Sequence, residues 1–152
     1  MSGIGIGDYL SAMRSDKEQL LSRFLDFWNE IYVKARDSRH YTGHITVSDH
    51  PNCIITLEGT GISLTARNRV VFYGKQLLLE MEFYRESKDK DESILKIYLA
   101  NDGRLFLGHP DDVESIDFFY DTTDVPFFEK LIQSLSNSGF ISIDRQPAHT
   151  PS

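Results

Sequence analysis

Four side chains that could bind a metal lie in one stretch of the sequence: His40, His44, His50 and Cys53. A structural zinc site needs four nitrogen or sulfur ligands in a tetrahedron, and a catalytic site needs three with one position open. The spacing of these four residues matches no standard zinc finger or ribbon. Whether they converge in space depends on the fold. Ordinary polar and turn residues explain them better, so we expect no metal and no cofactor.

Two carboxylates, Glu80 and Glu82, alternate with apolar residues, which places both on one face of an extended strand. Paired carboxylates can exchange protons with a substrate as general acid and base. However, the strand pairing described below puts Lys96 beside Glu82. A solvated face of ion pairs is therefore the better interpretation of this pair.

The sequence contains no nucleophile with a recognisable base and no phosphate-binding loop. It has neither a G-x-S-x-G nor a G-x-x-x-x-G-K-[ST] motif, and the glycines Gly3, Gly5 and Gly7 follow no strand that could present a nucleotide. The thiol of Cys53 precedes Ile54 and Ile55, which predicts a buried and unreactive cysteine. These observations favour a non-enzymatic protein over an enzyme.

Length and charge restrict the class of protein. The 152 residues fit one domain, which we assign to residues 8–144, with flexible termini at 1–7 and 145–152. The net charge of −7 disfavours binding to a nucleic acid backbone, which requires many Lys and Arg residues. There is one cysteine and no apolar run long enough to cross a membrane. We therefore expect a cytoplasmic protein with no membrane or nucleic acid partner.

The strongest structural pattern is a three-stranded antiparallel meander over residues 76–107. If the first turn is centred near Asp89, one register pairs Phe83 with Leu95, Met81 with Ile97 and Leu79 with Leu99. The same register places Glu82 opposite Lys96 on the other face. Because one choice satisfies both faces, we expect this pairing to form.

Turn residues extend the meander in both directions. A three-residue loop, Asn101-Asp102-Gly103, keeps Leu105 and Leu107 on the buried side, whereas a two-residue Asp-Gly loop would bury Phe106 instead. Upstream, Gly74-Lys75 predicts a two-residue turn that returns the chain along the first strand. Further strands are predicted at 41–47, 53–57 and 62–66, with no helix between them.

Two amphipathic helices are predicted at the ends of the chain. A capping box at Ser15 predicts a helix that runs to about Ala35, and Tyr9, Leu10 and Met13 could form a preceding helical turn. Asp124 is predicted to cap a second helix, which ends at Gly139. The apolar face expected for the first helix comprises Leu20, Leu21, Phe24, Leu25, Trp28, Ile31 and Tyr32. The predicted fold is α+β: an antiparallel meander sheet of about six to seven strands with an N-terminal and a C-terminal helix packed on it.

The second face of the meander is unusually apolar for a sheet covered on one side. Its candidate binding residues are Tyr73, Leu78, Glu80, Glu82, Tyr84, Tyr98 and Phe106. Three explanations remain open. One helix packs on each face, or the face binds another protein or a second copy, or it lines a small-molecule cleft.

The hypothesis for function follows from this face. Size, acidity and a sheet with helices are similar to those of small bacterial secretion chaperones and toxin-neutralising immunity proteins, a similarity of class and not of motif. We expect a non-enzymatic binding module, adaptor-like or chaperone-like, that docks a protein partner or forms a homodimer through the aromatic face. The acidic charge favours a basic partner. The alternative is a small enzyme or ligand-binding domain with a pocket between sheet and helix that uses carboxylates.

Overall fold

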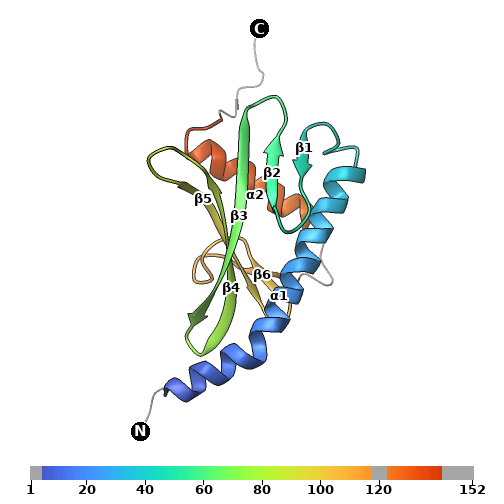
Figure 1. The fold of residues 1–152 in the computed structure, drawn as a ribbon. Helices are drawn as coiled ribbons and strands as arrows, with labels where there is room; N and C mark the ends of the chain where they lie inside the picture. The colour runs from blue at the N-terminus through green and yellow to red at the C-terminus, as the bar shows by residue number, and fades with distance from the viewer. Residues whose placement is uncertain (1–4, 118–122, 142–152) are drawn as a thin grey trace.

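The computed structural model describes residues 5–117 and 123–141 of the chain. Two helices, α1 (Ile6–Asp37) and α2 (Asp124–Asn137), accompany a single sheet (Figure 1). The sheet has seven antiparallel strands in the order of the sequence, from β1 to β7, so it is an uninterrupted meander. The predicted α+β class is confirmed. The strands are β1 (Ile45–Val47), β2 (Ile54–Leu57), β3 (Ile62–Tyr73), β4 (Gln76–Arg85), β5 (Glu92–Ala100), β6 (Arg104–Phe106) and β7 (Ser115–Asp117).

The predicted register of the central strands is confirmed. Phe83 pairs with Leu95, Met81 with Ile97, Leu79 with Leu99 and Glu82 with Lys96. The predicted turns are also present. Tyr73 pairs with Gln76 around the Gly74-Lys75 turn, and Leu99 pairs with Leu105 around the loop that ends at Gly103. Gly74 and Gly103 have φ angles of 63° and 93°, which L side chains rarely adopt.

The N-terminal strands differ from their predicted lengths. β3 is a single strand of 12 residues that continues well beyond Ala66, through Arg67, Asn68 and Arg69 to Tyr73. β1 is shorter than predicted, because residues before Ile45 form turns. The Ile45 amide, for example, bonds back to the carbonyl of Tyr41 at 2.9 Å.

Both helices pack on the same face of the sheet, which we call the inner face. The ring of Phe83 on β4 stacks on Trp28 of α1 at 6.3 Å between centroids, and it also contacts Phe127 of α2 at 5.2 Å. Buried residues of α1, α2 and strands β1 to β6 form one continuous core. The explanation in which one helix covers each face is therefore wrong. The opposite, outer face has no helix over it in the described part of the chain.

The first helix begins earlier and turns a different face to the core than predicted. It starts at Ile6, where Asp8 accepts a hydrogen bond from the Gly5 amide at 3.2 Å, so Ser15 lies inside the helix and does not begin it. The segment 5–7, assigned above to the N-terminal lead, thus forms the cap and first turn. The buried face includes Phe27, which the sequence analysis missed, whereas Leu21 and Leu25 are 39% and 44% exposed.

The C-terminal part of the chain follows the prediction more closely. Helix α2 begins at Asp124 and buries Phe127, Phe128, Leu131 and Leu135. Among the described residues, neither helix combines the length with the apolar composition of a membrane-spanning segment. The predicted terminal segment 145–152 lies outside the described residues.

Candidate functional site

The candidate metal ligands do not form a site. Among the described residues, no three His, Cys, Asp or Glu side chains come close enough to hold a metal ion. Cys53 is buried in the core at 4% exposure, and burial, helped by the negative charge of Asp49, raises its pKa to about 11. His50 packs its ring against Phe24, and His40 lies at the surface beside Tyr41. The side chains of segment 40–53 therefore contribute to core packing and to turns.

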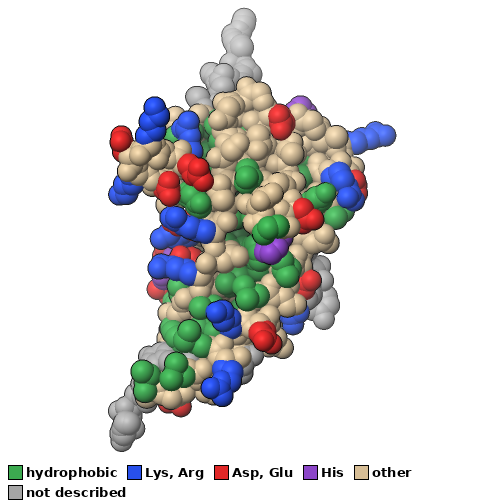
Figure 2. All heavy atoms as spheres, in the orientation of Figure 1, with side chains coloured by type: hydrophobic (Ala, Val, Ile, Leu, Met, Phe, Trp, Pro, Cys, Tyr) green, Lys and Arg blue, Asp and Glu red, His purple; other side chains and the backbone are tan. Residues whose placement is uncertain are grey.

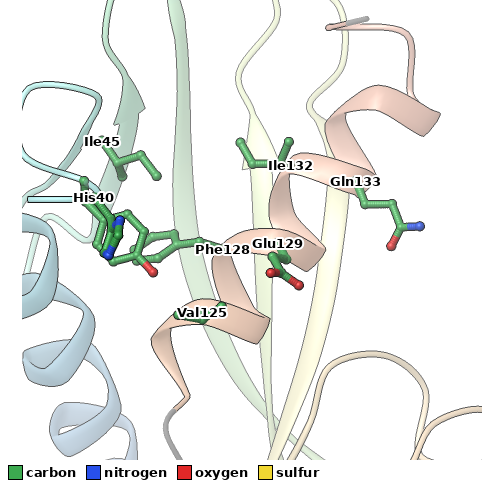
Figure 3. A pocket seen from close by; sticks show the side chains of 8 residues that line it. His40, Ile45, Val125, Phe128, Glu129, Ile132 and Gln133 are labelled. Carbon is green, nitrogen blue, oxygen red and sulfur yellow. The ribbon is translucent and has the colours of Figure 1, made fainter. Parts of the chain in front are cut away.

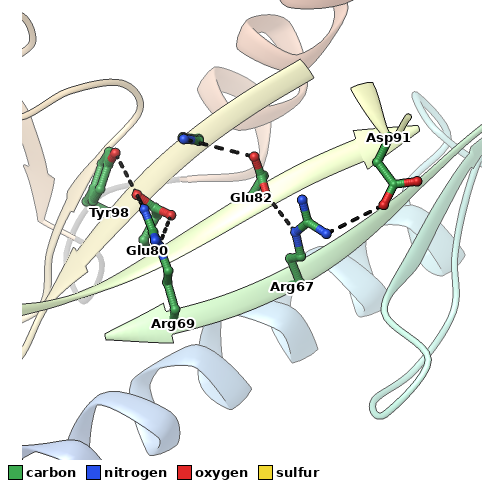
Figure 4. Close-up of polar contacts among 7 residues, drawn as sticks. Arg67, Arg69, Glu80, Glu82, Asp91 and Tyr98 are labelled. Atoms are coloured by element: carbon green, nitrogen blue, oxygen red, sulfur yellow. Dashed lines mark hydrogen bonds and ion pairs between the residues drawn. The ribbon is translucent and has the colours of Figure 1, made fainter. Parts of the chain in front are cut away.

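A buried carboxylate, Glu80, lies at the centre of the outer face. It is only 5% exposed although it projects from the side of the sheet that no helix covers. Its Oε1 atom accepts a 2.7 Å hydrogen bond from Nε of Arg69, and its Oε2 atom accepts a 3.0 Å bond from the Tyr98 hydroxyl (Figure 4). Burial and then the bond to Glu80 raise the pKa of Tyr98 to about 12. This carboxylate is thus fully engaged by neighbours on β3 and β5.

Glu82 repeats the arrangement two residues further along β4. Nε of Arg67 donates a 2.6 Å hydrogen bond to its Oε1 atom, and Lys96 Nζ lies 4.0 Å from Oε2. Burial by itself would raise the pKa of Glu82. Hydrogen bonds from Ser93 and Arg67 and the charges of Arg67 and Lys96 outweigh that effect, so the pKa is lowered. The expected pairing of Glu82 with Lys96 is present, with Arg67 as the closer cation.

The cations of this face, and not the carboxylates, reach the solvent. The side chains of Arg67, Arg69 and Lys96 are 52%, 66% and 43% exposed, against 14% and 7% for Glu82 and Glu80. They border a groove of about 350 Å³. Arg67 also lies 4.2 Å above the centroid of the Tyr84 ring, and its second nitrogen is 3.6 Å from Asp91 (Figure 4). Each arginine is therefore paired with a carboxylate, and Arg67 has a ring contact and a second carboxylate in addition.

The connection between β6 and β7 covers the other half of the outer face. The ring of His109 packs edge-on against both Tyr73 and Tyr98, with centroids 6.1 Å and 6.2 Å away, and the Tyr73 hydroxyl bonds to Asp111. A narrow groove of about 170 Å³ remains beside these rings. Leu78 and Phe106 are 1% and 8% exposed and form a small second core together with Ala100.

The seven candidate residues thus lie on one face but differ in their exposure to solvent. Leu78, Glu80 and Phe106 are buried and cannot touch a partner directly. Tyr73 is exposed, and Glu82, Tyr84 and Tyr98 are half-buried at the surface. Arg67 and Arg69 were not among the candidates. Their place was predictable, because continuing the register through the Gly74-Lys75 turn pairs them with Glu82 and Glu80.

A larger groove lies elsewhere, on the side of the molecule where α2 faces the chain before β1. Its volume is about 750 Å³ and its floor is apolar (Figure 3). Tyr41 and Phe128 form its base, with ring centroids 4.8 Å apart, and the Tyr41 hydroxyl bonds to the buried Asp124 at 3.1 Å. Sequence reasoning missed it, since its lining comes from two distant segments: His40, Tyr41, Ile45, Val125, Phe128, Glu129, Ile132 and Gln133.

Comparison of the chain with protein-family models, with curated proteins and with solved structures found no match to any of them.

Proposed function

We propose that this chain is a non-enzymatic protein-binding module of the chaperone, adaptor or immunity type, and that its partner docks on the outer face of the sheet. The observation that carries the proposal is the pair Arg67 and Arg69, held by carboxylates on a face that neither helix covers. Arg and Tyr are among the residues that are enriched at the centres of protein interfaces. Here the arginines and Tyr98 already bond to carboxylates, and Tyr84 already contacts Arg67. These contacts reduce the side-chain entropy that is lost when a partner binds.

The charge of this surface favours an acidic partner. The sequence-based expectation of a basic partner rested on the net charge of −7 for the whole chain. In the ion pairs at the centre of the outer face, Arg67, Arg69 and Lys96 are the exposed partners, while Glu80 and Glu82 are largely shielded. Local potential steers association and suppresses like-charged partners. We therefore propose a partner segment that carries carboxylates beside apolar groups, which would lie along Tyr73 and Tyr84.

The test is affinity capture from the native host with the full chain as bait, followed by mass spectrometry. The variant Arg67→Gln/Arg69→Gln removes the two exposed guanidinium groups. We expect it to lose the captured partner at least about tenfold. The matched control, Lys88→Gln/Lys90→Gln, makes the same change of charge in the exposed loop between β4 and β5.

Circular dichroism and urea unfolding of each variant separate loss of binding from loss of folding. If the arginine variant folds and captures the same proteins as the parent at equal yield, the outer face is not the docking surface. A captured partner whose cross-linked segment is basic contradicts the proposed chemistry.

A second candidate function is binding of a small apolar ligand in the groove beside α2. The groove has the volume typical of ligand pockets, which is about 300–1,000 Å³, and an apolar floor with the polar groups of His40 and Gln133 at its rim. Screening by NMR against small apolar fragments tests it. The variant Ile132→Trp should fill the groove and abolish fragment binding, whereas Leu21→Trp on α1 should leave it unchanged.

A further inference from the structure

The first helix carries most of the exposed apolar surface of the described chain. Seven large apolar side chains are exposed among these residues, and four of them belong to α1: Ile6 at 77%, Leu10 at 57%, Leu21 at 39% and Leu25 at 44%. The sheet covers α1 only from about Leu20 onward, where its fully buried residues begin. Figure 1 shows the N-terminal end of α1 projecting beyond the turn of the β3–β4 hairpin. Exposed patches of this kind mark interaction sites.

These four residues lie on a single stripe of the helix. Steps of three or four residues connect neighbours on one helical face. The stripe runs Ile6, Leu10, Arg14, Lys17, Leu21 and Leu25, all of which are exposed. The stripe is apolar at both ends and basic in the middle. The intervals between its successive residues are the same whether they are counted from the N-terminal or the C-terminal end. Figure 2 shows apolar side chains at the surface over the N-terminal half of α1.

A stripe with this symmetry is complementary to itself. If two copies of α1 pack antiparallel about a two-fold axis between residues 15 and 16, Leu10 of one copy faces Leu21 of the other. Ile6 likewise faces Leu25. A two-fold interface uses the same patch on both subunits, which is what this spacing provides. From the structure we infer that the partner for α1 is a second copy of this chain, bound antiparallel along the stripe.

The shape of the chain is compatible with this antiparallel arrangement. At the centre, Arg14 of one copy faces Lys17 of the other, and Glu18, one position from Lys17, lies beside Arg14 and offsets the repulsion between the two cations. The long Arg and Lys stems can cover apolar surface while their charged ends stay in water. The two helix dipoles oppose each other favourably. Because each sheet packs on the C-terminal half of its own helix, the two sheets lie at opposite ends of the pair and do not collide.

This dimer does not depend on the partner proposed for the outer face, since it uses none of the residues of that face. Its first test is the mass of the full chain in solution, measured by sedimentation from about 1 to 200 μM. We expect a concentration-dependent species of twice the chain mass. The variant Ile6→Asp/Leu10→Asp should raise the dimer dissociation constant at least about 100-fold. Both sites are exposed, and acidic residues near a helix N-terminus are favourable, so the helix should still form.

The control is Val125→Asp, which places the same charge on an exposed apolar position of α2, and it should still dimerise. A parent chain that stays monomeric at 200 μM would overturn the inference. Undiminished association of the Ile6→Asp/Leu10→Asp variant would overturn it as well.

Disulfide trapping tests the direction of the pairing. The variant Leu10→Cys/Leu21→Cys should form covalent dimers on oxidation. The two sites are 11 residues apart on one helix, or about 16 Å, too far for a bond within one chain. The single variant Leu10→Cys should not cross-link, because the two copies of residue 10 lie at opposite ends of the pair. Cross-linking of that single variant at the same rate would overturn the antiparallel pairing, as would failure of the double variant to cross-link.

Discussion

The hydroxyl of Tyr98 on β5 donates a 3.0 Å hydrogen bond to the buried carboxylate of Glu80 on β4, its direct cross-strand neighbour. The other oxygen of that carboxylate accepts from Arg69 on β3. Three adjacent strands are thereby joined on a face that has no helix above it. A buried charge is tolerated only when it is paired and hydrogen-bonded, which the two neighbours accomplish together.

Removal of the Tyr98 hydroxyl should therefore destabilise the domain. The change Tyr98→Phe leaves the ring in place but deprives Glu80 of one donor, so we expect the free energy of unfolding to fall by about 1–2 kcal/mol. Urea unfolding at pH 7 measures it. The control is Tyr84→Phe, whose hydroxyl has no hydrogen-bond partner among the described residues and whose loss should cost less than about 0.5 kcal/mol. Equal losses in the two variants would show that the Tyr98 bond contributes nothing specific.

Acid should weaken the fold in part through Glu82. Its folded-state pKa lies below the usual value of about 4.3, because the hydrogen bonds and cations around it outweigh its burial. A lowered pKa stabilises the folded state above the unfolded-state value, and this contribution is lost as the pH falls through the folded-state value. We expect the urea midpoint to drop between pH 6 and pH 3, and to drop less in Glu82→Gln. A variant with the parent's full pH dependence would exclude Glu82 as a cause.

Substitution of the single tryptophan, Trp28, should destabilise the core. Trp28 is 1% exposed, donates its indole N–H to the carbonyl of Ser48 at 2.8 Å, and stacks on Phe83. The change Trp28→Phe leaves that carbonyl without its donor and leaves space beside Phe83. We expect it to cost about 2–4 kcal/mol of unfolding free energy. Calorimetry of both proteins measures the loss, and an unchanged melting temperature would contradict the packing described.

The thiol of Cys53 should be inert in the folded protein. With a pKa of about 11, only about one thiol in a thousand is ionised at pH 8, and the side chain is almost fully buried. We expect an aromatic disulfide reagent to label the native chain at least about 100-fold more slowly than the chain in urea. Rapid labelling without denaturant would mean that the β1–β2 turn opens readily.

The central meander was predictable because its signals are local. A strand has a period of two, and a shift of one residue would move every apolar side chain of β4 to the wrong face. The turn residues Gly74 and Gly103 then fix the loop lengths on either side of the central strands. If the same register is continued to β3, it places Arg69 opposite Glu80, a pairing that the sequence analysis did not predict.

The helix boundaries and the orientation of α1 were less predictable. The capping box at Ser15 is a local preference of about 1 kcal/mol, which continuation of the helix to Ile6 overrides. The large apolar residues from Leu20 to Tyr32 span an arc of roughly 160° around α1 at about 100° per residue. This arc is wider than the face that meets the sheet, so the spacing by itself does not predict which part of it is buried. Contacts with Phe83 bury Trp28, together with Phe27, and leave Leu21 and Leu25 at the surface.

By itself, the sequence determined the strand pairing, the turns and the α+β class, since these depend on side-chain alternation and on residues a few positions apart. Only the tertiary structure decided that both helices share one face of the sheet. It also decided that the β6–β7 connection buries Leu78 and Phe106, and that His40 meets Ile132 across a groove. These relationships join segments far apart in the chain. They depend on how the whole core packs, which no local pattern records.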